Sequence, residues 1–207
     1  AGIEPAVAEF SVQPTERVAR IRTLDTWRVD RLAHAAVPLL VAVDDDDALV
    51  YVSLGARLAG LASYARAHGK RLQIERRRRT AARTQLHEYL AGKRTRFELE
   101  LRPLGTEFQL AVWNALVEIP YGATSSYGEL ADRLESPGSA RAVGRANHEN
   151  PLPIVVPCHR VVGHDGAMVG FGGGVPTKRW LLQLEQQRRP PQWSPRTEAP
   201  RQLGLFA

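Results

Sequence analysis

Residues 126–148, SYGELADRLESPGSARAVGRANH, decide the fold of the second half of this 207-residue chain. Ser126 and Glu129 have the spacing of a capping box, which predicts that a helix begins there, and Pro137-Gly138 predicts where it ends. Ser139 can cap a following helix that runs to about residue 147. Two helices joined by so tight a turn predict a helix-turn-helix.

The second of these helices places its basic side chains on one face. Arg141, Arg145 and His148 recur at i, i+4 and i+7, while Val143 and Ala146 point elsewhere. A basic stripe on a helix-turn-helix is typical of DNA binding, and the alternative is a solvated amphipathic face. The net charge of +6 is compatible with a nucleic-acid partner but does not decide between the two.

The flanking segments extend this helical unit in both directions. Thr106 and Gln109 form a capping box for a helix that Pro120-Tyr121-Gly122 ends. Residues 170–174 are a glycine-rich flexible loop, and residues 176–187 are expected to form a helix. The side chains expected in the core are Phe108, Val112, Ala115, Leu116 and Ile119 from the first helix, and Trp180, Leu181 and Leu184 from the last.

The first half of the chain predicts a small α+β unit. Two β-rich runs, 38–43 and 48–54, are separated by four aspartates, so we expect a hairpin whose acidic turn, Asp44 to Asp47, stays in solvent. We expect two helices and a further strand, over residues 57–68, 80–90 and 97–101. Four consecutive arginines at 76–79 predict a solvated surface, with a phosphate contact as the alternative.

These patterns predict an α+β protein with four parts. They are an N-terminal extension (1–19), an α+β domain with an antiparallel sheet (20–102), a mostly helical domain (103–188) and a disordered Pro-rich tail (189–207). A single cysteine permits neither an internal disulfide nor a Cys-rich zinc site, which favours a reducing, cytosolic compartment. No run approaches the length of a membrane span, and residues 1–9 lack the pattern of a signal peptide.

That one cysteine, Cys158, interrupts an apolar run and is followed directly by His159 and Arg160. The thiolate is the reactive form of cysteine, and a free thiol with a pKa of about 8.5 needs a positive charge or a base nearby to be reactive at neutral pH. The neighbouring residues supply both, which favours a nucleophile. The alternative is a small apolar residue accommodated in a buried strand.

The thiol, the helix-turn-helix and the glycine loop together closely resemble the O6-alkylguanine-DNA alkyltransferase family. The active-site signature Pro-Cys-His-Arg-Val is present at 157–161, preceded by Asn-Pro-Leu-Pro at 150–153. The resemblance is strong over residues 105–185 and only in outline over 20–102. The other matching segments are 105–109 (GTEFQ), 119–122 (IPYG), 126–131 (SYGELA), 141–144 (RAVG) and 178–182 (KRWLL).

The resemblance implies a role for each matching residue. Cys158 would attack the alkyl carbon on guanine O6, with His159, held by Glu185, drawing off the thiol proton through a water. Tyr127 would donate a proton to guanine N3 as the base leaves. The residues implied to contact DNA or the flipped base are Arg141, Arg145, Asn150, Val161, Phe171 and Gly172, with Arg141 entering the duplex, Asn150 holding the turn that presents the thiol, and Phe171 packing on the base.

The family also implies a ribonuclease H-like first domain and a reaction that each protein performs once, because the thiol is not regenerated. The expected substrate is double-stranded DNA with O6-alkylguanine, with O4-alkylthymine kept open. We expect a cytoplasmic, nucleoid-associated monomer without a cofactor. Many relatives have Tyr where this chain has Phe171, and some carry a zinc site that this chain cannot form without further cysteines, so we expect no metal.

Two other classes of protein remain as alternatives. A non-catalytic helix-turn-helix regulator would explain the basic stripe but leaves Cys158, His159 and Glu185 unexplained. A Cys-His hydrolase would need its histidine on a separate segment, because adjacent side chains on an extended strand point to opposite faces. That geometry favours a water bridge between Cys158 and His159.

The tail contains a separate motif, QLGLF, at residues 202–206. It resembles the short peptide by which bacterial repair and replication proteins bind the DNA sliding clamp, and the Pro-rich residues before it would keep the peptide extended. The implied contacts are Gln202 at the rim of an apolar pocket and Leu203, Leu205 and Phe206 within it. The alternative is a tail whose apolar end folds back on the core.

Overall fold

The structure of the protein is a computed structural model that describes residues 26–75 and 79–187. The predicted N-terminal extension, the first three arginines of the basic run and the tail with its QLGLF motif lie outside the described residues. Within residues 26–75 and 79–187, no helix is both long enough and apolar enough to cross a membrane.

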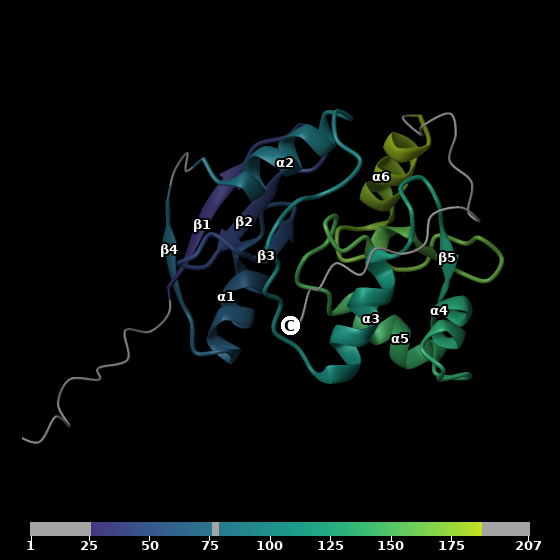
Figure 1. The fold of residues 1–207 in the computed structure, drawn as a ribbon. Helices are drawn as coiled ribbons and strands as arrows, with labels where there is room; N and C mark the ends of the chain where they lie inside the picture. The colour runs from purple at the N-terminus through teal and green to yellow at the C-terminus, as the bar shows by residue number, and fades with distance from the viewer. Residues whose placement is uncertain (1–25, 76–78, 188–207) are drawn as a thin grey trace, which may run out of the picture.

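A four-stranded sheet forms the centre of the first half (Figure 1). Its strand order is β3-β2-β1-β4, with β1 (Thr26–Leu32), β2 (Leu39–Val43), β3 (Leu49–Leu54) and β4 (Arg71–Ile74). The predicted hairpin is confirmed as the antiparallel pair β2–β3. The expectation of an antiparallel sheet is only partly correct, because β4 runs parallel to β1.

Helices cover both faces of this sheet. Leu61 and Ala65 of α1 (Leu58–Ala67) pack against Trp27, Val29 and their neighbours on one face. On the other face lies α2 (Ala81–Leu90), which begins at the Thr80 cap. The predicted helix is confirmed, and its Leu86, Tyr89 and Leu90 side chains are buried together.

The second half is mostly helical. The capping boxes at Thr106 and Ser126 are both present and begin the first two helices. In chain order the elements are α3 (Glu107–Val117), β5 (Ser125–Ser126), α4 (Tyr127–Arg133), α5 (Ala140–His148), the 3-10 turn η1 (Cys158–Arg160), β6 (Val161–Val162) and α6 (Val175–Gln187). Ser139 occupies the N-cap position of α5 as predicted, but its hydroxyl donates to the Ser136 carbonyl rather than capping the helix.

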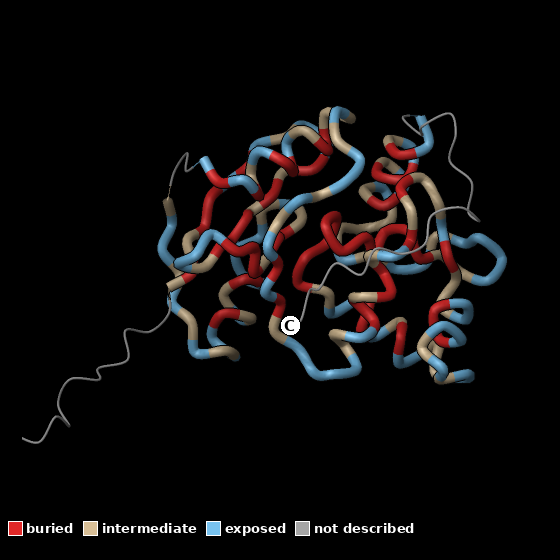
Figure 2. Tube along the Cα trace, in the orientation of Figure 1, coloured by how far each residue is buried: buried red, intermediate tan, exposed pale blue. Residues whose placement is uncertain are grey.

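One apolar core joins the two predicted domains. The cluster around Leu39 and Val41 of the sheet continues through Leu86 of α2 to Leu116 of α3 and to Cys158 itself. Figure 2 shows buried chain segments in both the sheet and the helical half. The boundary near residue 102 therefore divides secondary-structure elements but not the core.

The predicted strand over 97–101 is wrong except at its last residue. Side chains 97, 99 and 101 do turn inward in alternation, but Leu101 alone forms a β-bridge, with Leu49 of β3. The buried Gln85 amide accepts from the Glu98 N–H and donates to the Glu98 carbonyl, at 2.8 and 2.9 Å. A side chain of α2 therefore satisfies backbone groups that would otherwise need a neighbouring strand.

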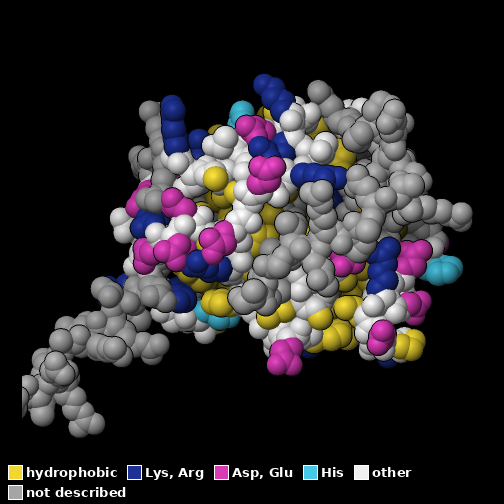
Figure 3. Space-filling model, viewed as in Figure 1, with side chains coloured by type: hydrophobic (Ala, Val, Ile, Leu, Met, Phe, Trp, Pro, Cys, Tyr) yellow, Lys and Arg dark blue, Asp and Glu magenta, His cyan; other side chains and the backbone are white. Residues whose placement is uncertain are grey.

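The expected exposure of the acidic turn is confirmed for Asp45, Asp46 and Asp47. Its carboxylates also pair with arginines: Asp44 and Asp46 both bind Arg102 at 2.7 Å, and Asp45 binds Arg28 at 3.0 Å. Figure 3 shows acidic and basic side chains close together at this end of the molecule. Phe108, expected in the core, is 38% exposed because it lies in the first turn of α3, while the other four expected positions of that segment are buried.

Candidate active site

The turn that carries Cys158 is fixed by side-chain and backbone hydrogen bonds. The Asn150 amide donates to the Val156 carbonyl at 2.8 Å and accepts from the Leu152 N–H at 2.9 Å, so one side chain spans the loop. Within this loop Ile154 has φ +79°, an uncommon conformation for a β-branched residue. The Val52 N–H of β3 donates to the Pro151 carbonyl at 2.8 Å, which ties the loop to the sheet.

Cys158 lies in a 3-10 turn rather than in a strand. The assumption of an extended strand is therefore wrong, because the Arg160 N–H closes a turn onto the Pro157 carbonyl. Successive side chains in a 3-10 helix diverge by about 120°. The conclusion that the thiol and the imidazole point to different sides still holds, with His159 fully buried against Glu185.

Glu185 of α6 is the centre of a buried hydrogen-bond cluster. Its carboxylate accepts from His159 Nε2 at 3.0 Å, from the Arg160 guanidinium at 2.8 to 3.2 Å, and from the Gly122 N–H at 2.9 Å. Tyr89 of α2 donates to it at 2.5 Å. Burial alone would raise the pKa of Glu185, but hydrogen bonds from His159 and Arg160 and the charge of Arg160 hold it well below its ordinary value.

His159 and Cys158 are both uncharged in this setting. Burial lowers the pKa of His159, although Glu185 opposes that shift. Burial also raises the pKa of the Cys158 thiol to about 11, against the smaller opposing effects of the Asn150 hydrogen bond and the Lys178 charge. The expectation that adjacent charge activates the thiol therefore needs revision, because the resting thiol keeps its proton and requires a base.

Lys178 is a functional candidate that the sequence analysis missed. Its side chain is fully buried, and Nζ donates to the carbonyls of Val161 and Val169 at 2.5 and 3.1 Å. Burial lowers the pKa of Lys178, and the interaction with Cys158 opposes this. The signal for its role lies in α6, where Lys178 and Glu185 share the buried face with Leu181 and Leu182.

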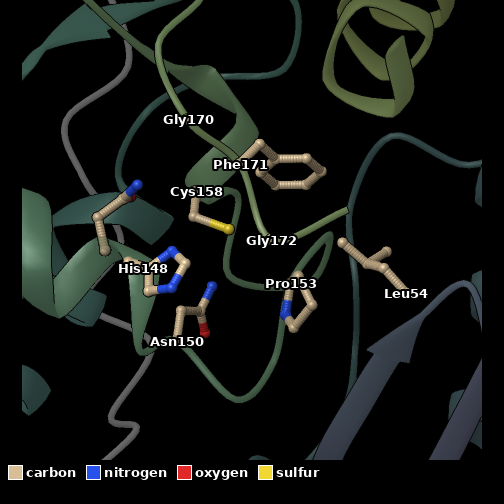
Figure 4. Close-up of a pocket in the computed structure, with 9 residues that line it drawn as sticks. Leu54, His148, Asn150, Pro153, Cys158, Gly170, Phe171 and Gly172 are labelled. Carbon is tan, nitrogen blue, oxygen red and sulfur yellow. The ribbon is translucent and has the colours of Figure 1, made fainter. Parts of the chain in front are cut away.

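A small cavity of about 40 Å³ opens beside the thiol. This is room for about one water molecule. Figure 4 shows the Cys158 sulfur pointing into it, with Asn150 and His148 on one side and Leu54 of β3 across from them. The lining residues are Leu54, Asn147, His148, Asn150, Pro153, Cys158, Gly170, Phe171 and Gly172.

Some of the predicted site residues line the cavity and others lie away from it. Asn150, Phe171 and Gly172 line the cavity with Cys158, whereas Val161 does not and is buried below it. Tyr127 is half-buried near the thiol, and burial raises its pKa, against a hydrogen bond with Asn147. Arg141 and Arg145 lie on the exposed face of α5 as predicted, with Arg145 paired to Glu149 at 3.0 Å.

The raised thiol pKa gives a direct prediction about reactivity. Because the pKa is about 11, iodoacetamide modification of native Cys158 should accelerate about tenfold per pH unit from pH 7 to 9. The unfolded chain should instead level off near pH 9, above the ordinary thiol pKa. Intact mass reports the reaction without ambiguity because the chain has one cysteine.

Lys178→Met should slow that reaction at every pH, because it removes the charge that favours the thiolate. Arg179→Met removes an exposed charge from the same helix and serves as the control. A native thiol that levels off at pH 9 would contradict the assignment of a buried, uncharged thiol.

Comparison with known proteins relates this chain to methylated-DNA--protein-cysteine methyltransferases. The family model of the DNA-binding domain of 6-O-methylguanine DNA methyltransferase matches residues 107–187. The methylated-DNA--protein-cysteine methyltransferase of Mycobacterium tuberculosis is 57% identical over 106 residues, and the aligned part spans 51% of this chain and 64% of that relative. The Methanosarcina acetivorans protein of the same name is 52% identical over 104 residues, 50% of this chain and 67% of the relative.

Solved structures extend the match to the sheet. The crystal structure of Mycobacterium tuberculosis OGT in complex with DNA is 41% identical, with a TM-score of 0.67, and the match covers 79% of this chain and 96% of that one. The Mycobacterium tuberculosis O6-methylguanine methyltransferase is 40% identical with a TM-score of 0.69, over 80% and 96% of the two chains. Together with the buried Cys158, His159 and Glu185, these matches show that the chain belongs to the methylated-DNA--protein-cysteine methyltransferase family.

Proposed function

We propose that this chain repairs alkylated DNA by moving an alkyl group from guanine O6 to Cys158. The observation that carries the proposal is a buried thiol that faces a cavity and is backed by the His159–Glu185 pair. The names of the relatives and the DNA in one matching structure support it. In the reaction the bond between Sγ and the alkyl carbon forms as the bond between that carbon and O6 breaks.

Two proton transfers accompany this step. The thiol proton passes through one water to His159 Nδ1, since the two side chains diverge in the 3-10 turn. Tyr127 remains protonated at neutral pH because its pKa is raised, and it donates to guanine N3 as the base leaves. The base therefore leaves neutral, with His159 left protonated and Tyr127 left as a phenolate. Return of one proton from His159 to Tyr127 through solvent then balances the step.

The base must leave the duplex to reach this thiol, because O6 lies within the stack. We assign α4 and α5 to a helix-turn-helix whose exposed face lies in the minor groove, with Arg141 inserted in place of the flipped base and Arg145 at the backbone. Phe171 packs on the flipped base, and the Gly172 amide lies near O6. The strand order of the sheet, with β2 antiparallel to the other three, supports a ribonuclease H-like first half.

The product is a thioether, which nothing in this proposed mechanism cleaves. Each protein therefore repairs one lesion. We also propose that it acts as a monomer on double-stranded DNA. O4-alkylthymine presents the same bond between an alkyl carbon and an exocyclic oxygen, and we propose it as a second lesion.

The first test is the intact mass of the protein after incubation with a duplex that contains O6-methylguanine. We expect a gain of one methyl group and no more, however large the excess of DNA. Cys158→Ala should gain nothing while keeping its DNA affinity within a few fold, because phosphate contacts dominate affinity. Methyl transfer by that variant, or many turnovers by the wild type, would contradict the mechanism. No transfer at all would favour a regulator or a hydrolase.

The second test concerns Arg141. Arg141→Ala should slow repair of duplex DNA about tenfold or more while leaving the reaction with free O6-benzylguanine unchanged, because the free base needs no flipping. Arg145→Ala removes the same charge from the same face and is the matched control: it should weaken binding but not the rate at saturating DNA. An equal loss in both reactions for Arg141→Ala would make that residue structural.

The tail motif supports a further, separate proposal, which is docking on the bacterial DNA sliding clamp. Its support is the sequence alone: Gln202, Leu203, Leu205 and Phe206 follow a Pro-rich stretch. A peptide of residues 200–207 should bind the cognate clamp in fluorescence anisotropy with modest affinity, and Leu205→Ala with Phe206→Ala should abolish binding. Binding that survives both changes would remove the clamp without affecting the repair proposal.

A further inference from the structure

We propose that Tyr89, which lies in the first half of the chain, is a positioning residue for the reaction and fixes which nitrogen of His159 is the base. The inference rests on the proposed function. It concerns a residue of α2 that is far in sequence from the Cys158 signature and that reaches the relay across the shared core.

The contacts of Tyr89 are specific. Its hydroxyl donates to Glu185 Oε1 at 2.5 Å and lies 3.3 Å from His159 Nε2, while Nε2 lies 3.0 Å from the same Oε1. Three polar groups from α2, η1 and α6 therefore meet at one buried point. The ring of Tyr89 is held by Phe97 and Tyr121, with ring centroids at 5.3 and 6.0 Å.

The position of each proton at this point follows from charge and burial. Glu185 is ionised and can only accept. Burial, reinforced by the Glu185 charge, raises the pKa of Tyr89 well above its ordinary value, so the phenol keeps its proton and donates it to Oε1. The lone pairs of the Tyr89 oxygen are then left for Nε2.

His159 Nε2 is consequently placed between two acceptors, the Glu185 carboxylate and the Tyr89 oxygen. A neutral imidazole carries one proton, and this arrangement places it on Nε2. Nδ1 is left as the unprotonated nitrogen, and within residues 26–75 and 79–187 it has no hydrogen-bond partner. It is the only ring nitrogen available to receive the thiol proton.

The role of Tyr89 would be lost in the opposite tautomer. A proton on Nδ1 would leave the relay without a base on the thiol side and would place an unprotonated Nε2 against the carboxylate, where two acceptors repel. Glu185 alone disfavours that arrangement, and Tyr89 adds a second group that opposes it. The first half of the chain therefore contributes to the chemistry as well as to the fold.

Tyr89→Phe tests this directly, because it keeps the ring and removes only the hydroxyl. We expect the rate of methyl transfer from saturating duplex DNA to fall about tenfold, with unchanged DNA affinity. This is less than the roughly 10²–10⁴-fold that general-base catalysis contributes, because Glu185 still orients His159. Tyr64→Phe is the matched control: Tyr64 is also in the first half, and among the residues that the structure describes its hydroxyl bonds only the Leu104 backbone, at 2.7 and 2.8 Å. Its loss should leave the rate unchanged.

A double-mutant cycle separates positioning from general support of the fold. In the Glu185→Gln background, Tyr89→Phe should cost much less than tenfold, because the two residues act through the same imidazole. Equal slowing in both backgrounds would show that Tyr89 does not act through Glu185 and would overturn the proposal. A folded Tyr89→Phe protein with an unchanged rate would overturn it as well.

The tautomer itself can be measured without any variant of Tyr89. Nitrogen-15 spectra of the wild-type protein, with His159→Gln to assign the signals, should show a protonated Nε2 and an unprotonated Nδ1 at neutral pH. Tyr89→Phe should shift the population toward the other form. A protonated Nδ1 in the wild type would overturn the proposal even if the variant did not fold, and absence of methyl transfer by the wild type would refute the repair function instead.

Discussion

The buried Glu185 carboxylate is the constraint on which the rest of the structure depends. A carboxylate without solvent is tolerated only when its oxygens are hydrogen-bonded and its charge is balanced, and removing one partner from such a pair costs about 3–5 kcal/mol. Glu185 meets this requirement with Arg160, His159, Tyr89 and the Gly122 N–H. These donors come from three separate segments and Glu185 from a fourth, so the same requirement fixes α2, the turn after α3, η1 and α6 around one point.

In the proposed mechanism, that arrangement lets a thiol with a raised pKa serve as a nucleophile. Burial keeps Cys158 protonated at rest, which protects it from unselective reaction. Glu185 is held too weakly basic to take the proton, so its charge orients and supports His159 instead. The positive charge of Lys178 favours the thiolate form of Cys158. Reactivity is thereby tied to the presence of a base and a correctly placed substrate.

Local signals allowed much of the fold to be predicted from the sequence. Capping boxes and the proline and glycine stops located α3, α4 and α5, and the aspartate-rich turn located the β2–β3 hairpin. The strands β1 and β4 could not be found in this way, because β1 carries Arg28 and Asp30, whose partners Asp45 and Arg83 lie elsewhere in the chain. The strand expected near Glu98 failed for a related reason, since a distant glutamine replaces the neighbouring strand.

The site residues also differ in whether a short sequence pattern identifies them or only a contact across the core does. Cys158, His159 and Glu185 could be assigned from a short signature and its resemblance to a family. Tyr89 and Lys178 could not, because each acts through contacts made across the core, and a tyrosine or a lysine at helical spacing has no signature of its own. The 3-10 turn at Cys158 was hidden by its apolar flanks, which favour a strand.

The core that runs from the sheet to Cys158 also has a consequence for how the protein matures. During synthesis the sheet and α2 emerge first and the cysteine later, while Glu185 lies in α6, the last helix of the described chain. The hydrogen-bond cluster around His159 is therefore complete only when α6, the last described helix, has docked. In the proposed mechanism, a copy of the protein without docked α6 lacks the pair that removes the proton from Cys158.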